Sequence, residues 1–292
     1  MKMHVIGCSG GKHISQKIAK KLGVKEHSKL KVEEFPDGEL HLRFDDKAKI
    51  KNREVLLVQS FYGNPNDKIV ETLFAAQSAK KRGAKQVKLL ALYFPYFRQD
   101  KEFEKGEIVS IDILSKMFKF FDRIYAVEPH LHRIDYIQDV MENGKKIDLS
   151  PILADQIKKW KLDNPIFIGP DDESYQWARS VAEKLGAKST ILSKKRKGDR
   201  DVKVELKNSI ILEDSPVVII DDIVSTGKTM LETVKKIGKR EPSQIYIIAI
   251  HGIFADPKTL KELEKHAKVI STNTIPSERS KIDISDIAKM EH

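Results

Sequence analysis

Residues 217–229, which read VVIIDDIVSTGKT, combine an aliphatic strand with two carboxylates and a turn rich in hydroxyl groups. Backbone N–H groups at the start of a helix bind phosphate; the hydroxyl of Ser225 adds a donor, and Gly227 permits close approach to the backbone. The carboxylates of Asp221 and Asp222 can accept hydrogen bonds from ribose hydroxyls or hold the water around Mg²⁺. The segment therefore predicts a binding site for a phosphorylated sugar.

The same turn has two other interpretations. Gly227-Lys228-Thr229 matches the end of a P-loop, but a P-loop also needs a glycine where this chain has Asp222. A carboxylate there would repel the phosphate that a P-loop holds, so we set that interpretation aside. The other is an acidic strand end followed by an ordinary helix cap, without chemistry. Open α/β sheets bind ligands at the carboxyl ends of parallel strands, which favours a binding site.

A run of cations, Lys194-Lys195-Arg196-Lys197, follows an apolar pair and precedes Gly198 and charged residues. This composition predicts a mobile loop. By itself the run is typical of a solvated loop or of one that contacts nucleic acid. A lysine point charge and an arginine fork are also a suitable pair for neutralising phosphate oxygens.

Other polar segments are ambiguous when each is taken alone. Residues 35–39, Phe-Pro-Asp-Gly-Glu, are simply a turn by composition, although Phe35 could stack on a purine and the carboxylates could accept from its amine. Arg98 could be an exposed cation. His130 and His132 have a spacing found in transition-metal sites, but no third clustered ligand and no nearby cysteine support a zinc site.

Taken together, these segments resemble the ribose-phosphate diphosphokinases, also called phosphoribosyl diphosphate synthetases. The strand, the paired Asp residues and the Ser-Thr-Gly-Lys-Thr turn resemble the motif that this family shares with type I phosphoribosyltransferases. Ordinary phosphoribosyltransferases resemble only the second half of the chain, and the modest length resembles the shorter archaeal diphosphokinases. The segments that carry the wider resemblance span almost the whole chain and are Phe35-Pro36-Asp37-Gly38-Glu39, Asn66-Asp67, Pro95-Tyr96-Phe97-Arg98-Gln99-Asp100, His130 and Thr272-Asn273-Thr274-Ile275-Pro276.

The resemblance implies a reaction. The family transfers the β,γ-diphosphoryl group of ATP to the C1 hydroxyl of ribose 5-phosphate, releases AMP and uses Mg²⁺. It also implies site residues for ribose 5-phosphate, for catalysis, for ATP and for the metal. The residues for ribose 5-phosphate are Asp221, Asp222, Ser225, Thr226, Gly227, Lys228 and Thr229, and those for catalysis are Lys194 and Arg196. The residues for ATP are Phe35, Asp37, Glu39, Arg98, Gln99 and Asp100. The residues for the metal are His130 and Asp171.

The chain departs from the family pattern at a few positions. Glu128 stands where the family commonly has Asp, with the charge retained. Glu173-Ser174 stand where a glycine pair usually follows the acidic residue, so only Asp171 is carried over from that segment. Lys195, between the two loop cations, leaves the register of the Lys-x-Arg pair open.

Apolar runs that alternate with amphipathic helix patterns must position these residues. Uninterrupted Val, Ile and Leu runs indicate strands buried on both faces, and helices between them indicate a mainly parallel α/β sheet covered on both sides. The predicted strands are residues 55–58, 87–92, 124–127, 166–168, 217–220 and 245–250.

A strand–helix–strand plan occurs twice, around the strands at Val55 and Val217, with helix stops at Gly83 and Gly238. We therefore expect two related α/β domains, residues 1–145 and 146–292, joined near Asn143-Gly144, with the end of the chain packed back on the first domain. The resemblance implies that each is a mainly parallel sheet flanked by helices, of the type I phosphoribosyltransferase kind.

Composition limits the class of protein. A net charge of +10 suits anionic ligands, although most cations have acidic neighbours and form a solvated surface. The longest apolar run, 245–255, is too short for a membrane span, and the lone Cys8 excludes an intrachain disulfide. The N-terminus lacks a secretory pattern, so we expect a cytoplasmic protein.

Other functions remain as alternatives at this point. A phosphoribosyltransferase acting on a nucleobase would lack ATP-site residues, and a regulatory relative without turnover would lack the loop cations or the paired Asp. Nucleic-acid binding would need stacking aromatics beside the cations, and none is present, so we expect no nucleic-acid or membrane partner. The resemblance implies ATP and ribose 5-phosphate as ligands and a homo-oligomer.

Overall fold

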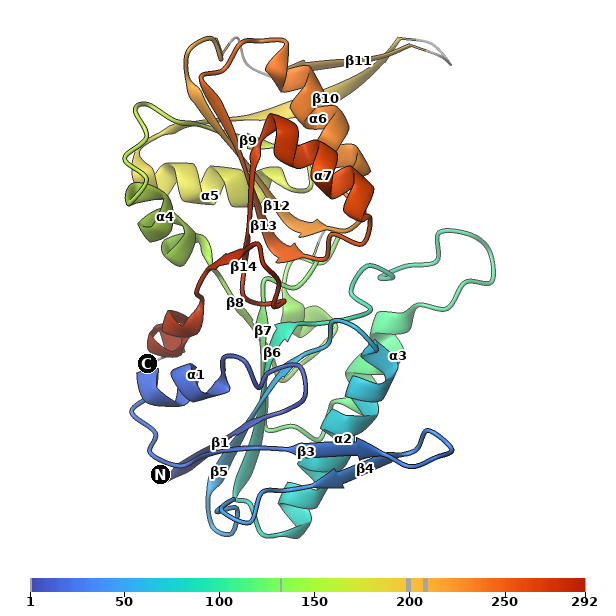
Figure 1. The fold of residues 1–292 in the computed structure, drawn as a ribbon. Coiled ribbons are helices and arrows are strands. Elements are labelled where there is room, and N and C mark those ends of the chain that lie inside the picture. The colour runs from blue at the N-terminus through green and yellow to red at the C-terminus, as the bar shows by residue number, and fades with distance from the viewer. Residues whose placement is uncertain (1, 132, 198–200, 207–209, 292) are drawn as a thin grey trace. The chain divides into compact units, whose positions relative to one another are not determined.

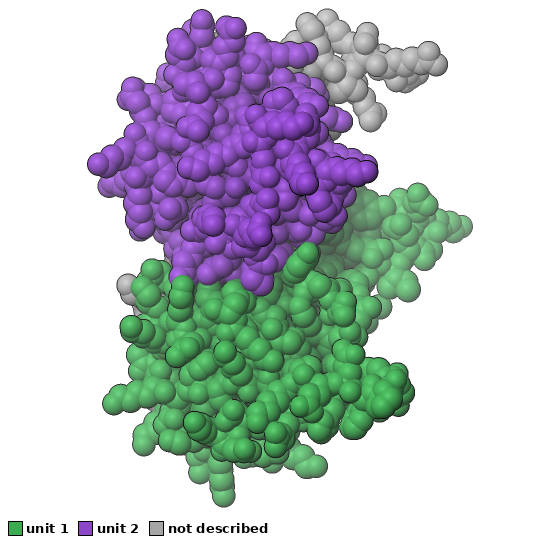
Figure 2. Space-filling view, in the orientation of Figure 1, with its two compact units in different colours: residues 1–148, 285–292 green, residues 149–284 purple. Residues whose placement is uncertain are grey.

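The structure, a computed structural model, describes residues 2–131, 133–197, 201–206 and 210–291, with the backbone alone at 193–197, 201–206 and 289–291. The chain divides into two compact units. Unit 1 comprises residues 1–148 and 285–292, and unit 2 comprises residues 149–284 (Figure 2). The end of the chain therefore belongs to the same unit as its beginning.

Unit 1 is built on a parallel sheet with the strand order β2-β1-β5-β6-β7-β8. All residues of β5 are buried, as expected of a central strand covered on both faces. The strands are β1 (Met3–Gly7), β2 (His27–Lys29), β5 (Glu54–Ser60), β6 (Gln86–Tyr93), β7 (Arg123–Val127) and β8 (Gly144–Ile147).

Helices lie on both sides of this sheet (Figure 1). On one side are α2 (Pro65–Lys81) and α3 (Ser110–Met117); on the other, α1 (Ser15–Lys21) packs against η2 (Ser285–Glu291). A short 3-10 turn, η1 (Ile137–Asp139), precedes β8. Helix α2 starts at a proline, carries Asp67 in its first turn and is followed by Gly83 with a positive φ, three features that define helix ends. The helix stop predicted at Gly83 is thus confirmed.

A separate antiparallel hairpin projects from unit 1. It consists of β3 (Lys31–Glu34) and β4 (Leu40–Arg43), and residues 35–39 form its tip. Strand β4 packs against α2. Gly38 has φ of 90°, a conformation that an L side chain rarely adopts, so the tip depends on this glycine.

Unit 2 contains a second sheet with the order β11-β10-β9-β12-β13-β14-β15, in which only the β10–β11 pair is antiparallel among the described strands. Its central strand β13 buries nearly all of its residues, and every residue of the neighbouring β12 is buried or half-buried. The strands are β9 (Ile166–Gly169), β10 (Lys188–Lys197), β11 (Asp201–Leu206), β12 (Pro216–Val224), β13 (Gln244–Gly252), β14 (Lys268–Thr272) and β15 (Ser280–Ile282).

The helices of unit 2 pack in pairs. Helix α4 (Ser150–Lys158) packs against α5 (Tyr175–Leu185), and α6 (Lys228–Gly238) packs against α7 (Pro257–His266). The carboxylate of Asp256 caps α7 by accepting hydrogen bonds from the N–H groups of Lys258 and Thr259. None of the described helices combines the length and apolar character needed to cross a membrane.

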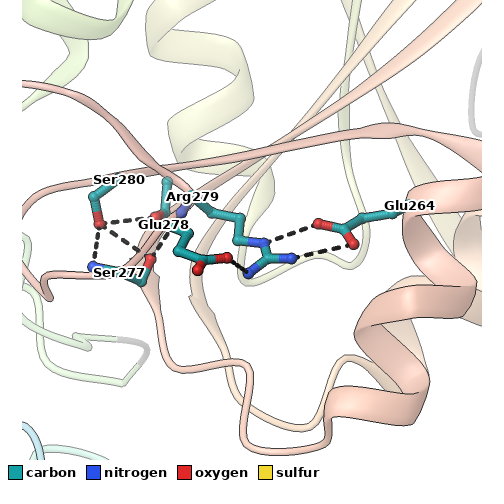
Figure 3. Close-up of polar contacts among 6 residues, drawn as sticks. Glu264, Ser277, Glu278, Arg279 and Ser280 are labelled. Atoms are coloured by element: carbon teal, nitrogen blue, oxygen red, sulfur yellow. Dashed lines mark hydrogen bonds and ion pairs between the residues drawn. The ribbon is translucent and has the colours of Figure 1, made fainter.

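The segment between β14 and β15 is tied to α7 (Figure 3). The guanidinium of Arg279 donates to both carboxylate oxygens of Glu264, at 2.8 and 3.3 Å, and to Glu278 at 2.9 Å. The hydroxyl of Ser280 accepts from the N–H of Ser277 at 2.9 Å. These contacts hold the end of unit 2 in place before the chain enters η2.

The predicted α/β architecture is confirmed, and each of the six predicted strands lies within a parallel strand. Strand β12 is longer than predicted, because Ile223 and Val224 pair with His251 and Gly252 of β13. The two aspartates therefore lie inside the strand instead of at its end.

Two other segments differ from expectation. The run beginning at Lys194 was expected to be a loop, but its backbone continues β10 and pairs with β11, because alternating valines in 201–206 supply a partner strand. The expected join near Asn143-Gly144 is the start of β8, which pairs with β7, so the units divide between Asp148 and Leu149.

Burial of β12 makes a stability prediction. Ile219 is fully buried and pairs with β9 and β13, so Ile219→Ala should lower the free energy of unfolding by about 2–5 kcal/mol. Chemical denaturation followed by circular dichroism measures the change. The control is Ile211→Ala, which removes a side chain that is 77% exposed and should change stability by less than about 0.5 kcal/mol. Equal effects of the two substitutions would contradict the placement of β12.

Candidate functional site

The strand order of unit 2 creates a crevice between the carboxyl ends of β9 and β12. Strand β9 connects through α5 to β10 on one side, and β12 connects through α6 to β13 on the other side. Such a reversal of strand order is where open α/β sheets bind ligands. The loop after β9 carries Asp171, and the turn after β12 is residues 225–227. The topology thus brings together the acidic and hydroxyl groups that the sequence predicted for the sugar phosphate and the metal.

The turn after β12 is shaped as an anion site. Gly227 caps α6 with φ of 81°, and a side chain there would meet Leu263 at 3.0 Å and Thr259 at 3.3 Å. Within the described part of the chain, no acceptor takes the N–H of Thr226 or Gly227. These donors, at the N-terminus of an 11-residue helix, are therefore available to phosphate oxygens. Lys228 and Thr229 begin the helix and are exposed.

The turn is held by the chain that follows β13. The carbonyl of Ser225 accepts from the N–H of Ala255 at 2.9 Å, and the carbonyl of Val224 accepts from Ile253 and Phe254 at 3.0 and 3.1 Å. Because the carbonyls are satisfied internally, the backbone of the turn is fixed while its N–H groups stay open.

Three carboxylates lie close to this turn. Burial, and then the negative charges of Asp222 and Asp171, raise the pKa of the Asp221 carboxyl well above its usual value. Asp222 is 3% exposed and accepts from the N–H of Ile223 at 2.7 Å. The mutual repulsion means that a cation or hydrogen-bond donors from a ligand would stabilise the cluster.

Ser174 orients Asp171, a role that the sequence did not indicate. The N–H and the hydroxyl of Ser174 donate to Asp171 Oδ1 at 2.8 and 2.7 Å, and Ser174 itself is buried. The sequence resemblance predicts glycine near this position, and the serine present here contributes a polar contact instead. A sequence pattern of Asp followed three residues later by Ser is a common turn and did not single out the contact.

The cations predicted for catalysis are Lys194 and Arg196. Their backbones lie in β10 and pair with Val204 and Val202 of β11. Their side chains fall outside the described residues, so their role remains a prediction.

In unit 1, two predicted segments meet at the carboxyl edge of the sheet. Arg98, Gln99 and Asp100 follow β6, and His130 follows the neighbouring strand β7. Arg133 joins the two segments: its Nε lies 3.1 Å from both carboxylate oxygens of Asp100, and its Nη2 lies 2.6 Å from Oδ1.

The Asp100 side chain is 2% exposed, so loss of Arg133 would leave a nearly buried polar group without this partner. The Arg133 guanidinium also lies over the ring of Phe103, 5.0 Å from its centroid. Sequence reasoning missed Arg133, because nothing in its local sequence distinguishes it from an exposed cation.

Neighbouring contacts set the conformation of these loops. Ser110 donates its hydroxyl to Gln99 Oε1 at 3.0 Å, whereas Arg98 is exposed. His130 is half-buried. Glu128 is fully buried and lies 3.0 Å from the Lys146 ammonium, so this carboxylate is already paired.

The residues predicted to meet the adenine lie at the tip of the β3–β4 hairpin. Phe35 is 48% exposed, and its ring centroid is 5.1 Å from that of His41. Asp37 and Glu39 are exposed, and Asp37 Oδ1 accepts from the Glu39 N–H at 3.2 Å. Among the described residues, the tip makes no hydrogen bond or ion pair with residues 98–100. The structure therefore does not join the two predicted ATP segments within unit 1.

The corresponding crevice of unit 1, between β1 and β5, is filled by its own loop. Ser9 donates its N–H to Glu71 at 2.7 Å, and Gly10 donates to Gln59 at 2.8 Å. A side chain at Gly10 would lie 2.0 Å from the carbonyl of Ser60, so the loop packs tightly on β5. The N–H groups of Ser9 and Gly10 are thus occupied, whereas those of Thr226 and Gly227 in unit 2 have no acceptor among the described residues.

Among the described residues, no group of three His, Cys, Asp or Glu side chains is arranged to hold a metal ion. Asp171 belongs to unit 2 and His130 to unit 1, so each predicted ligand is positioned by a different sheet. Mg²⁺ is commonly held by one or two carboxylates together with water and substrate phosphates. The acidic cluster of unit 2 has the oxygen donors for such a role.

Comparison with known proteins covers both units. Residues 3–121 match a family model described as the N-terminal domain of ribose phosphate pyrophosphokinase, and residues 143–285 match the phosphoribosyl transferase domain. The ribose-phosphate pyrophosphokinase of Sulfurisphaera tokodaii is 31% identical over 98% of both chains. That of Pyrococcus abyssi is 29% identical over 97% of this chain and 96% of its own.

A solved structure has the same fold. The phosphoribosylpyrophosphate synthetase from Mycobacterium smegmatis aligns with a TM-score of 0.81, at 22% identity, over 97% of this chain and 93% of its own. Together with the family models, this confirms the predicted fold of two domains of the phosphoribosyltransferase type, each a parallel sheet flanked by helices.

The raised pKa of Asp221 makes a prediction about stability. A carboxyl with a higher pKa in the folded state favours folding at low pH, and this contribution is lost as pH rises through the folded-state pKa. Asp221→Asn should therefore be more stable than the parent at pH 8, and the difference should disappear as pH falls to the usual range of an aspartate. Thermal unfolding across pH measures it. A parent that is the more stable protein at pH 8 would contradict the expected repulsion.

Proposed function

The chain belongs to the ribose-phosphate pyrophosphokinase family, and we propose that it transfers the β,γ-diphosphoryl group of ATP to the C1 hydroxyl of ribose 5-phosphate. The products are 5-phosphoribosyl 1-diphosphate and AMP, which is a step towards nucleotides. The observation that carries the proposal is the open phosphate turn beside paired aspartates at the crevice of unit 2. The family-level similarity supplies the choice of reaction.

Ribose 5-phosphate would bind at the turn of unit 2. The free N–H groups of Thr226 and Gly227, with the hydroxyls of Ser225 and Thr229, suit the 5-phosphate. Asp221 and Asp222 would accept hydrogen bonds from the ribose hydroxyls, which lowers the cost of their mutual repulsion. Lys228 adds a positive charge near the phosphate.

Diphosphoryl transfer chiefly requires neutralisation of charge on the moving group. Attack occurs at the β-phosphorus, and negative charge is spread over the phosphate oxygens in the transition state. Lys194 and Arg196 would supply donors to those oxygens, the lysine as a point charge and the arginine as a fork. Their place in a hairpin that ends at the edge of the sheet is compatible with closure over a ligand.

Mg²⁺ fits the residues present. Asp171, oriented by Ser174, would hold the ion or its water, and His130 would contact the metal bound to ATP. When bound, Mg²⁺ would neutralise charge on the phosphates and fix their orientation. The raised pKa of Asp221 supports the need for a positive partner in this cluster.

ATP would be held by unit 1. Arg98, Gln99 and Asp100 would form one part of its site, fixed by the ion pair to Arg133. Phe35 at the exposed hairpin tip would stack on the adenine, while Asp37 and Glu39 accept from its amine. Because the tip makes no polar contact with the first segment in the described chain, we propose a homo-oligomer in which the tip serves a neighbouring subunit. The cytoplasmic location remains a prediction.

A product assay tests the function. The full chain is incubated with ATP, Mg²⁺ and ribose 5-phosphate, and AMP and phosphoribosyl diphosphate are measured together. The proposal expects equal amounts of both and no activity after chelation of the divalent ions with EDTA. ADP as the product would mean an ordinary kinase, and activity with phosphoribosyl diphosphate and a nucleobase alone would mean a phosphoribosyltransferase.

Loss of either hairpin cation should slow the chemical step. Lys194→Ala and Arg196→Ala should each lower kcat by roughly 10²-fold or more, as expected for removal of one transition-state donor, with little change in ribose 5-phosphate affinity. Initial rates and equilibrium binding separate the two effects. Lys239→Ala, which removes an exposed lysine at the end of α6, is the control. Near-normal kcat in both variants would remove these residues from the mechanism.

The Asp100–Arg133 pair should matter for ATP. Arg133→Ala leaves a nearly buried carboxylate without its cation, so we expect the KM for ATP to rise about tenfold or more. Arg133→Lys should restore part of this loss, since it keeps the charge but not the fork. The control is Arg123→Ala, an exposed arginine on β7. An unchanged KM for ATP would show that the ion pair only supports the fold.

A further inference from the structure

A cavity of about 710 Å³ lies in unit 1, apart from the residues of the proposed active site. Its lining includes Met3, Glu54 and Lys88, which lie at or near the amino ends of β1, β5 and β6. The predicted ATP and metal residues of this unit follow the carboxyl ends of the strands. The cavity is therefore at the other end of the sheet from the loops that serve the reaction.

The two faces of the sheet differ in chemistry. Side chains alternate along a strand, and the register pairs Leu56 with Lys88 and Leu90 with Tyr125. With Glu54, these residues form one face, and all of them line the cavity. The opposite face, under α2 and α3, is apolar and fully buried; it includes Val55, Leu57, Leu89 and Ile124. Glu54 and Lys88 thus place charged groups on this face, whereas the opposite face is apolar.

A comparison of the units explains why space is left on this face. In unit 2, helix α5 connects β9 to β10. It has 11 residues and packs against the 9-residue helix α4. In unit 1 the corresponding helix, α1, has 7 residues and is packed against the 3-10 segment η2, also of 7 residues. The shorter cover leaves the cavity between the sheet, residues 22–25 after α1, and Ile287 and Ala288 of η2.

The cavity has an apolar interior and a cationic rim. Aliphatic side chains from the sheet and both covering elements form the interior: Ile18, Leu22, Leu56, Leu90 and Ile287. The basic residues in the lining are Lys2, Lys25, Arg53 and Lys88.

The two acids of the lining are already paired. Glu54 lies 2.5 Å from the Lys88 ammonium, and Glu26 lies 3.0 Å from Lys49 and 3.8 Å from Arg53. Lys2 and Lys25 have no ion pair with a described residue, and Arg53, at 3.8 Å, is the more distant of two cations that share the single charge of Glu26. Positive charge is therefore left over at the rim, where a negative group of a ligand would be stabilised.

We propose that this cavity binds an amphipathic organic anion. Its apolar body lies on Leu56 and Leu90, and its phosphate or carboxylate group pairs with Arg53 and Lys25. The volume is within the roughly 300–1,000 Å³ typical of small-molecule sites, which favours a small ligand over a protein segment. Burial of the apolar body drives binding, and the charged head gives orientation.

Binding would also involve the returning end of the chain. Ile287 and Ala288 line the cavity, and Asp286 of the same segment forms a 2.7 Å ion pair with Lys21 of α1. Both groups of that ion pair are partly exposed, so the pair by itself contributes little to stability. A bound ligand would add contacts to η2 and should slow hydrogen exchange of its backbone amides.

The probe for binding is 1-anilinonaphthalene-8-sulfonate, a fluorescent amphipathic anion, titrated into the full chain in the presence of ATP and ribose 5-phosphate. The proposal expects saturable binding that weakens about tenfold or more in the double variant Lys25→Gln/Arg53→Gln. The neutral analogue N-phenyl-1-naphthylamine should bind the parent at least about tenfold more weakly, because it lacks the charged group. Equal affinity of the two probes would overturn the role of the rim.

The control variant is Phe74→Ala, which removes an exposed aromatic on α2, outside the cavity. It should leave binding of the probe unchanged. If this variant loses binding while the double variant keeps it, the probe lies on the α2 surface and the proposal is overturned. Thermal unfolding of each variant checks folding.

Competition by decyl phosphate and by decanoate distinguishes a phosphate head from a carboxylate head. Failure of both to displace the probe, or no slowing of exchange at residues 285–288, also contradicts the site.

Discussion

Parallel pairing of β12 with β9 on one side and β13 on the other is the constraint on which the unit 2 site depends. Since β12 continues beyond Asp221 and Asp222 to Val224, both residues are held by the ladder, with Asp222 buried and Asp221 half-buried. The same pairing fixes where the turn begins and where Gly227 starts α6. Carboxylates placed in this way repel each other, and that repulsion can be relieved by ligand hydroxyls or a cation.

The two units share a parallel-sheet architecture, but the loops after their strands differ. In unit 2 the N–H groups of Thr226 and Gly227 have no acceptor among the described residues, whereas in unit 1 the N–H groups of Ser9 and Gly10 donate to Glu71 and Gln59. In unit 1 the loops after β6 and β7 carry the predicted ATP and metal residues, and the ion pair between Arg133 and Asp100 joins these loops. In the proposed function, sugar-phosphate binding and nucleotide binding would therefore fall on different units, because loops vary while the buried strands stay the same.

Covering elements also distinguish the units. Helix α5 of unit 2 packs against the regular helix α4, whereas α1 of unit 1 packs against the 3-10 segment η2, which lines a cavity with a cationic rim. A ligand whose apolar part lies on this lining would remove that part from water, and the basic residues at the rim would stabilise its negative group. This gives a physical reason why an apolar ligand with a negative group would be bound there, and why binding and the position of the chain's end would be linked.

The sequence by itself determined six of the parallel strands, the fold class and the family, because aliphatic runs, turn residues and motif order depend on local patterns. The turn at 225–229 and the hairpin tip at 35–39 were also readable in that way. Only the tertiary structure decided that Arg133 holds Asp100, that Ser174 orients Asp171 and that β12 extends to Val224. These contacts join residues that the chain brings together by folding, and their energies depend on burial and pairing that no local pattern contains.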